Sequence, residues 1–166
     1  MIRLDDVRDA QKRLVGVIRP TSIDRSATLT RLLGRPIALK PEHLQRTGSF
    51  KIRGATNFVS RLPPGTEVVA ASAGNHAQGV ALAATNAGLA STIFMPRSAA
   101  LPKVQATEGY GGNVRLVGDS VDDAIAAGRA YAAERGASFV PPFDHPLVIA
   151  GQGTIGLELA EQLPQL

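Results

Sequence analysis

The pattern of apolar and polar positions changes its period repeatedly through the middle of the chain. Four segments have the length of strands, at residues 68–71, 91–95, 113–117 and 138–140, and the first is apolar throughout, as in a strand buried on both faces. Three segments of helical length lie between them, at residues 76–87, 101–110 and 121–135. This alternation predicts an α/β fold class, with a twisted parallel sheet, right-handed crossovers and flanking helices.

Further periodic segments flank this alternating region. Residues 4–18 carry apolar side chains at gaps of three and four, which predicts a helix that Pro20 stops. Residues 37–40 predict a short strand and residues 50–62 a helix. After the last predicted strand, a glycine-rich stretch leads into a final helical pattern that begins near Ile155.

Composition narrows the classes of protein. The chain has 166 residues, about one domain, with 44% hydrophobic and 19% charged residues, which argues against disorder. Aromatic residues are 4% with no Trp, so no base-stacking surface for nucleic acid is expected. The absence of Cys excludes disulfides and thiolate metal sites, and three His argue against a histidine-rich metal site. No apolar window of about 18 residues occurs, so we expect a cytoplasmic protein with no membrane partner. From the Cys and His counts we also expect no bound metal.

The charge is distributed unevenly along the chain. Residues 1–61 hold 13 Lys and Arg against 5 Asp and Glu, whereas residues 62–166 hold 5 against 9. The basic third could serve an anionic ligand or an acidic partner. Because these charges are not clustered in a run, a solvated basic face or a surface that meets other protein is the commoner interpretation.

Lys51 stands near the start of the helix predicted over residues 50–62. A cation is unusual there, because a helix N-terminus carries partial positive charge, and the same field lowers the pKa of a lysine. A neutral lysine amine is the form that condenses with an aldehyde. From the residues alone, a surface lysine tolerated near the helix cap is the commoner interpretation.

Residues 72–76 form the connection between the first strand of the alternating region and the helix that follows it. Ligands of parallel sheets bind at the carboxyl ends of strands, and a helix N-terminus attracts a carboxylate or phosphate. The Asn75 amide could donate to an oxygen of such a ligand. The alternative is an ordinary connection in which Asn75 caps the helix.

Residues 151–156 match the G-x-G-x-x-G pattern of dinucleotide sites letter for letter. Such a site needs the pattern after the first strand and an acidic residue about 20 positions later, and neither condition holds. We therefore expect a glycine-rich entry to a packed helix. Asp122 and Asp123 are expected as helix N-terminal acids, and His43 and His145 as surface or capping residues.

Four blocks of the sequence, in order, resemble the serine/threonine dehydratases (threonine ammonia-lyase-like), which are fold type II, tryptophan-synthase-β-like, pyridoxal-phosphate enzymes. The blocks are residues 40–55 (KPEHLQRTGSFKIRGA), 72–81 (SAGNHAQGVA), 102–104 with Tyr110-Gly111, and 142–144 with 149–158 (IAGQGTIGLE). The resemblance covers nearly the whole chain. It implies a lyase of amino-acid metabolism that converts threonine or serine to a 2-oxo acid and ammonia by β-elimination, as in isoleucine biosynthesis.

The resemblance also implies roles for particular residues. Lys51 would bind pyridoxal 5'-phosphate covalently and later carry the α-proton, with Phe50 packed beside the cofactor ring. Asn75 would donate to the phenolic oxygen of the cofactor. Residues Ser72, Ala73, Gly74, Asn75 and His76 would hold the carboxylate of a small amino-acid substrate. Similar serine racemases carry a serine where this chain has Ala73, so dehydration is preferred to racemisation.

The same resemblance divides the chain into domains. Residues 1–51 and 147–166 would belong to a large cofactor domain and residues 52–146 to a small α/β domain. In the family, the loop that cradles the cofactor phosphate follows the last helix seen here, so the chain is expected to be C-terminally truncated, with an incomplete large domain. Two hypotheses remain open. The chain is either a dehydratase, usually a homo-oligomer, that needs the missing portion, or an inactive fragment or interaction module.

Overall fold

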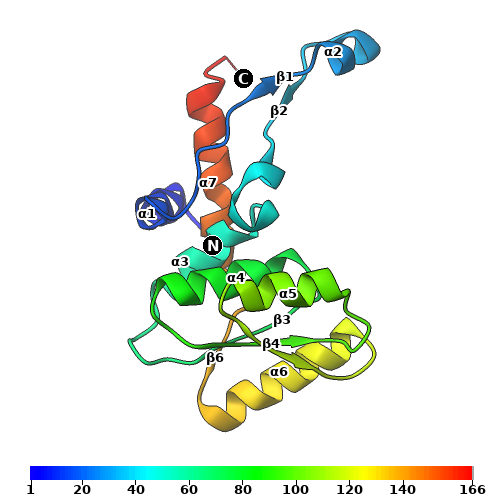
Figure 1. Ribbon diagram of the computed structural model, residues 1–166. Coiled ribbons are helices and arrows are strands. Elements are labelled where there is room, and N and C mark those ends of the chain that lie inside the picture. Colours follow the sequence, from blue (N-terminus) through cyan, green and yellow to red (C-terminus); the bar gives the residue numbers. More distant parts are fainter. Residues whose placement is uncertain (166) are drawn as a thin grey trace.

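The computed structural model describes residues 1–165, and its centre is a four-stranded parallel sheet (Figure 1). The strands are β3 (Val68–Ala71), β4 (Ser91–Met95), β5 (Asn113–Leu116) and β6 (Ser138–Phe139), in the order β5-β4-β3-β6. All three pairings are parallel. The predicted α/β class and parallel sheet are therefore confirmed.

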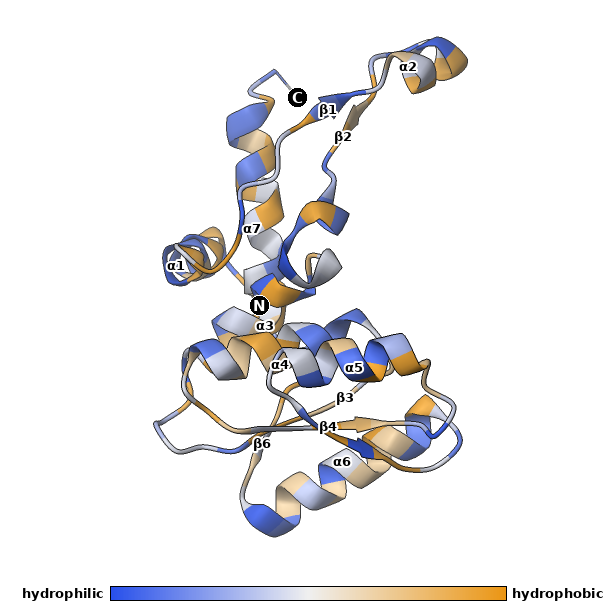
Figure 2. Cartoon of the chain, in the orientation of Figure 1, coloured by the Kyte–Doolittle hydropathy of each residue, from blue (hydrophilic) through white to orange (hydrophobic). Residues whose placement is uncertain are grey.

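Helices cover both faces of this sheet. α4 (Asn75–Asn86) and α5 (Leu101–Gly109) lie on one face, and α6 (Val121–Arg135) lies on the other (Figure 1). Side chains along β3 alternate between the two cores: Val68 and Ala70 pack into the cluster under α4, and Val69 and Ala71 into the cluster over α6. All four are buried, which explains why this strand is apolar throughout. Figure 2 shows β3 and β4 as apolar ribbons between the helices.

A second layer stands on the α4 side of the sheet. It consists of α1 (Leu4–Leu14), α3 (Lys51–Val59) and α7 (Pro146–Gln162), with α3 packed against both α4 and α7. Two 3-10 turns, η1 (Glu42–Leu44) and η2 (Arg46–Gly48), precede α3. An antiparallel pair, β1 (Asp24–Arg25) and β2 (Ala38–Leu39), carries α2 (Ala27–Leu33) away from the sheet (Figure 1). Among residues 1–165, no helix is both long and apolar enough to cross a membrane.

The interior elements agree with the sequence predictions, and the outer ones differ at their ends. The strands at 68–71 and 91–95 and the helix at 121–135 have the predicted bounds. The predicted helix over residues 4–18 is wrong at its C-terminal end, because α1 stops at Leu14 and Gly16 turns the chain with φ +78°. Val17 and Ile18 then pack on the main core as part of the turn. The strand predicted at 37–40 is confirmed in shortened form.

The interpretation of residues 151–156 as the entry to a helix is wrong. α7 begins at Pro146, where the His145 ring accepts a hydrogen bond from the Leu147 amide at 3.2 Å, which confirms His145 as a capping residue. The glycines lie inside the helix and permit a close crossing with α3. A Cβ on Gly151 would stand 2.6 Å from the Arg53 carbonyl oxygen, and one on Gly54 would stand 2.7 Å from the Gln152 amide nitrogen.

Candidate functional site

The candidate site lies where two neighbouring parallel strands end. Residues 72–76 follow β3, and the segment that leaves β6 reaches Pro142. Because parallel neighbours end at the same edge of a sheet, the two connections lie side by side. α3 begins near this edge, because its first residue is Lys51 and the Lys51 Nζ bonds the Pro142 carbonyl oxygen.

Lys51 points at the segment that leaves β6. Its Nζ donates a hydrogen bond to the Pro142 carbonyl oxygen at 2.7 Å, and it lies 5.3 Å from the centroid of the Phe50 ring. The side chain is half-buried, and this burial lowers the pKa of the Lys51 amine below the ordinary lysine value. The direction of this pKa shift agrees with the sequence prediction, but its cause is burial and not the helix N-terminus. A larger fraction of this amine is therefore neutral than in a lysine free in water.

A tight turn precedes Lys51 in the chain. Thr47 and Gly48, in η2, adopt φ values of +64° and +66°. The left-handed region is unfavourable for a β-branched residue, so Thr47 holds local strain. Thr47 and Ser49 are buried, and the Lys51 amide donates to Ser49 Oγ at 3.3 Å. The start of α3 is thus set by this turn and by the contacts of the helix with α4 and α7.

The connection after β3 exposes the N-terminus of α4. Gly74 is the N-cap residue of α4, with φ −151° and ψ −143°, and its amide donates to Ser72 Oγ at 3.1 Å. Within residues 1–165, no side chain caps this helix. The interpretation of Asn75 as the cap is wrong: Asn75 is the first helical residue, and it is exposed. The first amides of α4 have no partner within the helix and remain available to an anionic ligand.

His76 is buried behind this connection and does not face solvent. Its Nε2 lies 3.0 Å from the Val140 carbonyl oxygen, so this nitrogen carries the proton and donates. Burial lowers the pKa of His76 to about 4, and the positive charge of Lys51 acts in the same direction. The ring is therefore neutral at pH 7, and it fastens the start of α4 to the chain that leaves β6.

Lys51 and the 72–76 connection belong to one site. A Cβ on Gly79, in α4, would lie 3.2 Å from the carbonyl carbon of Lys51, so the two helices touch at the start of α3. Pro142 and Val140, two residues apart, accept hydrogen bonds from Lys51 and His76. The structure thus links Lys51 and His76 through the segment that leaves β6, while the role of each site residue stays a prediction.

A buried ion cluster lies behind Lys51, and sequence reasoning missed it. The Arg53 guanidinium bonds Glu42 at 2.8 and 2.9 Å and Glu158 at 2.6 and 3.1 Å. Lys40 bonds Glu158 at 2.6 Å. We call these four residues, Lys40, Glu42, Arg53 and Glu158, the buried ion cluster. They lie inside two of the blocks that carry the resemblance, but no local spacing rule pairs residues this far apart in sequence.

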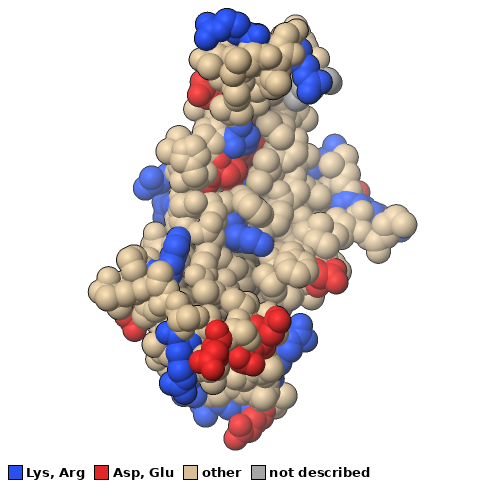
Figure 3. Space-filling model, turned by 90° about the vertical axis from the view of Figure 1, so that its right-hand side faces the viewer, with Lys and Arg blue, Asp and Glu red and all other residues tan. Residues whose placement is uncertain are grey.

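The basic character of residues 1–61 is partly neutralised within the chain. Lys40 and Arg53 form ion pairs within the buried ion cluster, and Arg8 and Lys12 pair with acidic residues on α1. Figure 3 shows basic side chains at the end of the molecule that carries α2, and acidic and basic side chains mixed at the sheet end.

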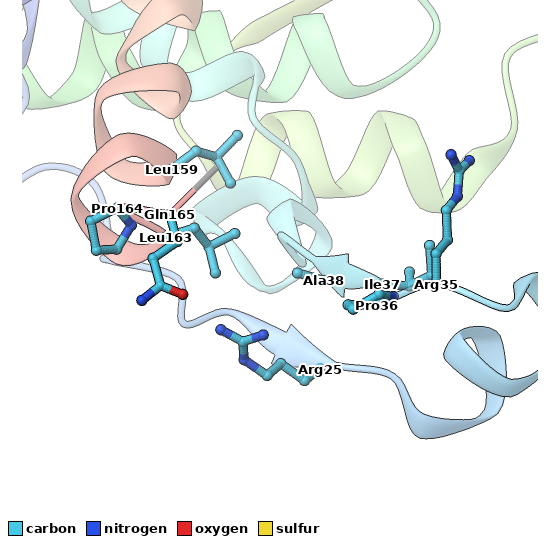
Figure 4. A pocket seen from close by; sticks show the side chains of 9 residues that line it. All are labelled: Arg25, Arg35, Pro36, Ile37, Ala38, Leu159, Leu163, Pro164 and Gln165. Atoms are coloured by element: carbon cyan, nitrogen blue, oxygen red, sulfur yellow. The ribbon is translucent and has the colours of Figure 1, made fainter.

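A separate hollow lies at the hairpin end of the molecule. It measures about 820 Å³ and lies between the β1–β2 hairpin and the C-terminal end of α7 (Figure 4). Its lining is mostly apolar and includes Ile37, Leu159 and Leu163. It contains neither Lys51 nor the 72–76 connection, so it is not the site that the sequence predicts.

Comparison with known proteins identifies the family. The sequence profile of the pyridoxal-phosphate dependent enzyme family matches residues 14–166. L-threonine ammonia-lyase of Thermotoga maritima is 50% identical over 100% of this chain and 42% of its own length. The solved structure of the T.th. threonine deaminase is 41% identical, with a TM-score of 0.90 over 98% of this chain and 52% of that one. Maize serine racemase is 35% identical, with a TM-score of 0.94 over 99% and 51%.

The chain therefore belongs to the pyridoxal-phosphate dependent enzymes, and its structural neighbours are fold type II members of that family. It spans about half the length of the relatives that it matches. The described residues fit part of a pyridoxal-phosphate site. They offer a half-buried amine of lowered pKa, an aromatic ring beside it and an uncapped helix N-terminus.

Proposed function

We propose that this chain supplies the lysine-bearing part of a threonine or serine dehydratase, which releases a 2-oxo acid and ammonia by β-elimination. The observation that carries the proposal is the half-buried Lys51 amine beside the uncapped start of α4. This pairs a nucleophilic amine with an anion-binding helix end, which is what an amino-acid substrate and an aldehyde cofactor require. The names of the relatives favour threonine as the substrate.

Each site residue has a role in this proposal. Lys51 would hold the cofactor through its aldehyde, and the amine, helped by its lowered pKa, would carry the α-proton of the substrate. Phe50, 38% exposed, offers an apolar surface for the cofactor ring, and exposed Asn75 donates its amide to a ring oxygen. The backbone of residues 72–76 binds the substrate carboxylate. Pyridoxal 5'-phosphate, when bound, supplies the electron sink for the elimination.

Racemisation is the second candidate, because maize serine racemase shares the fold with a TM-score of 0.94. Reversal of configuration requires a second proton-handling group on the face opposite the lysine. The resemblance places a serine at residue 73 for that purpose, and this chain has Ala73, whose methyl group carries no proton to exchange. Dehydration is the better supported reaction.

The proposal extends to domain organisation and setting. Residues 1–51 and 147–166 form part of a large domain, residues 52–146 form the small domain, and a further portion of the protein holds the cofactor phosphate. The working enzyme is a cytoplasmic homo-oligomer in amino-acid metabolism, with isoleucine biosynthesis as one setting. The competing possibility, an interaction module without chemistry, is supported by the half-length match alone.

A titration with pyridoxal phosphate separates these possibilities. The 166-residue chain and its Lys51→Ala and Lys103→Ala variants are mixed with the cofactor, and the absorbance of the lysine adduct is recorded. We expect an adduct band in the wild type and in Lys103→Ala, and none in Lys51→Ala. An equal band in Lys51→Ala contradicts the role of Lys51. Assay of 2-oxo acid release from threonine and serine, on the longest product of the gene, then tests the reaction.

A further inference from the structure

Arg53 is the most heavily bonded side chain of the described residues, and its side chain is 0% exposed. Its Nε donates to Glu42, its Nη1 to Glu158 and Thr154, and its Nη2 to both carboxylates. These five bonds match the five N–H donors of a guanidinium. A side chain with every donor used has one orientation, so the α3 turn that carries it is held in one place.

The partners of Arg53 come from outside the helix that carries it. Glu42 lies in η1, before α3, and Glu158 lies in α7, 105 residues further along the chain than Arg53. Lys40 completes the cluster and is itself tied to the Thr21 carbonyl at 2.6 Å. The buried ion cluster therefore fastens the first turn of α3 to both segments that we assign to the large domain.

Lys51 and Arg53 project from opposite sides of the same helical turn. Residues two apart on a helix are separated by about 200° around its axis. Lys51 accordingly faces Pro142 and the start of α4, whereas Arg53 faces α7. Any rocking of the α3 start that loosened Arg53 from its carboxylates would also swing Lys51 away from Pro142.

We propose that Arg53 is a positioning residue for Lys51, clamping the first turn of α3 between Glu42 and Glu158 so that the Lys51 amine stays half-buried at the 72–76 connection. A buried ion cluster is a weak source of net stability, because desolvation offsets the attraction, and apolar residues of similar volume often serve as well. What it adds is a fixed geometry. The proposal rests on the proposed function for the meaning of Lys51, and its test is independent of turnover.

The test uses a charge-balanced double variant, Arg53→Met/Glu42→Leu, which removes the clamp and retains the Lys40–Glu158 pair. Removing one charge of each sign leaves little net Coulomb effect on Lys51. The matched control is Arg135→Met/Glu67→Leu, an Arg–Glu pair joined at 3.1 Å near the far side of the sheet. Folding is checked by circular dichroism and by a cooperative thermal transition.

The readout is the 15Nζ NMR shift of the four lysines, Lys12, Lys40, Lys51 and Lys103, followed over pH in the 166-residue chain. In the folded double variant we expect the titration midpoint of Lys51 to rise by about half a pH unit or more, about a threefold loss of neutral amine. The control pair should leave this midpoint unchanged. A folded double variant with the wild-type Lys51 midpoint overturns the proposal.

Arg53→Lys serves if the double variant does not fold. It retains the charge and lacks the planar fork that bridges two carboxylates. A raised Lys51 midpoint in this variant supports the clamp, and an unchanged midpoint overturns it. The two proposals fail separately. If wild-type Lys51 forms no adduct with pyridoxal phosphate but its midpoint still responds to Arg53, the proposed function fails and the positioning stands.

Discussion

The sheet region and the outer layer of α1, α3, α7 and the hairpin share one apolar core, and the outer layer adds buried paired charges to it. The sheet region is a layered apolar core, in which buried Val, Ala and Ile side chains fill both faces of β3 and β4. The outer layer joins the same core through Ile52, Val59 and Val148, and it adds a buried ion cluster and glycines that let α3 and α7 touch. Apolar packing tolerates small changes, whereas paired charges and backbone contacts do not. The candidate site lies where the two regions meet, and Lys51 belongs to the less tolerant one.

The largest expected difference in unfolding free energy between the two regions follows from removing the charge of Arg53. Arg53→Ala leaves Glu42 and Glu158 buried together, with only Lys40 to compensate. Loss of one partner of a buried ion pair costs about 3–5 kcal/mol of unfolding free energy. Urea denaturation measures the loss. Arg135→Ala, at the exposed pair with Glu67, is the control and should change stability far less. Equal effects of the two variants would remove the contrast between the regions.

Because His76 is buried and neutral where the two regions meet, we expect the stability of the chain to depend on pH. Its pKa is about 4 in the folded chain and about 6.5 when unfolded, so the unfolded state binds the proton first as pH falls. Stability should therefore decrease from pH 6.5 down to about 4, by about 3 kcal/mol from this group.

The lowered pKa of Glu158 acts in the same direction at lower pH, so the His76 part is isolated by comparison with variants. Denaturation at several pH values should give a shallower decrease in His76→Gln than in the wild type. His43→Gln, at an exposed position, should retain the wild-type decrease. A wild-type slope in His76→Gln would show that this histidine is not the buried neutral group described above.

A smaller effect distinguishes two glycines of the same helix. An added methyl at Gly151 would stand 2.6 Å from a backbone oxygen of α3, whereas at Gly156 it would meet nothing within 4 Å. Gly151→Ala should destabilise the chain by about 1–3 kcal/mol through overpacking. Gly156→Ala should be neutral, or stabilising by up to about 1 kcal/mol, since Ala is the better helix former. Thermal unfolding of both variants measures this, and equal behaviour would contradict the close α3–α7 crossing.

The contrast also explains which parts could be predicted from sequence. The strands at residues 68–71 and 91–95 could be predicted, because each is a short apolar run that is visible in the local sequence. α7 contains Gly151 and Gly153 before the predicted start of its helix, and only tertiary contacts explain them: Gly151 lies against α3 and Gly153 against Val7 of α1. The Arg53–Glu158 bonds join residues that are 105 positions apart in the sequence, so no local pattern indicates them.

The candidate site shows the same division. Lys51 and the 72–76 connection could be predicted, because each stands at the start of a helix in a recognisable motif. The burial that lowers the pKa of Lys51 could not be predicted, because it depends on how α3, α4 and the segment at Pro142 pack together. The alternative in which Asn75 caps the helix is wrong, because Gly74 takes the N-cap position and Asn75 is the first, exposed residue of α4.

The most direct test of the central claim, that Lys51 is the aldehyde-binding amine, locates the adduct chemically. The chain is incubated with pyridoxal phosphate below saturation, reduced with borohydride and digested, and mass spectrometry measures the modified fraction of each of its four lysines. We expect Lys51 to carry most of the label, because it alone combines a lowered pKa with a neighbouring anion-binding helix end. Label spread over Lys12 and Lys103, with Lys51 unmodified, would contradict the account.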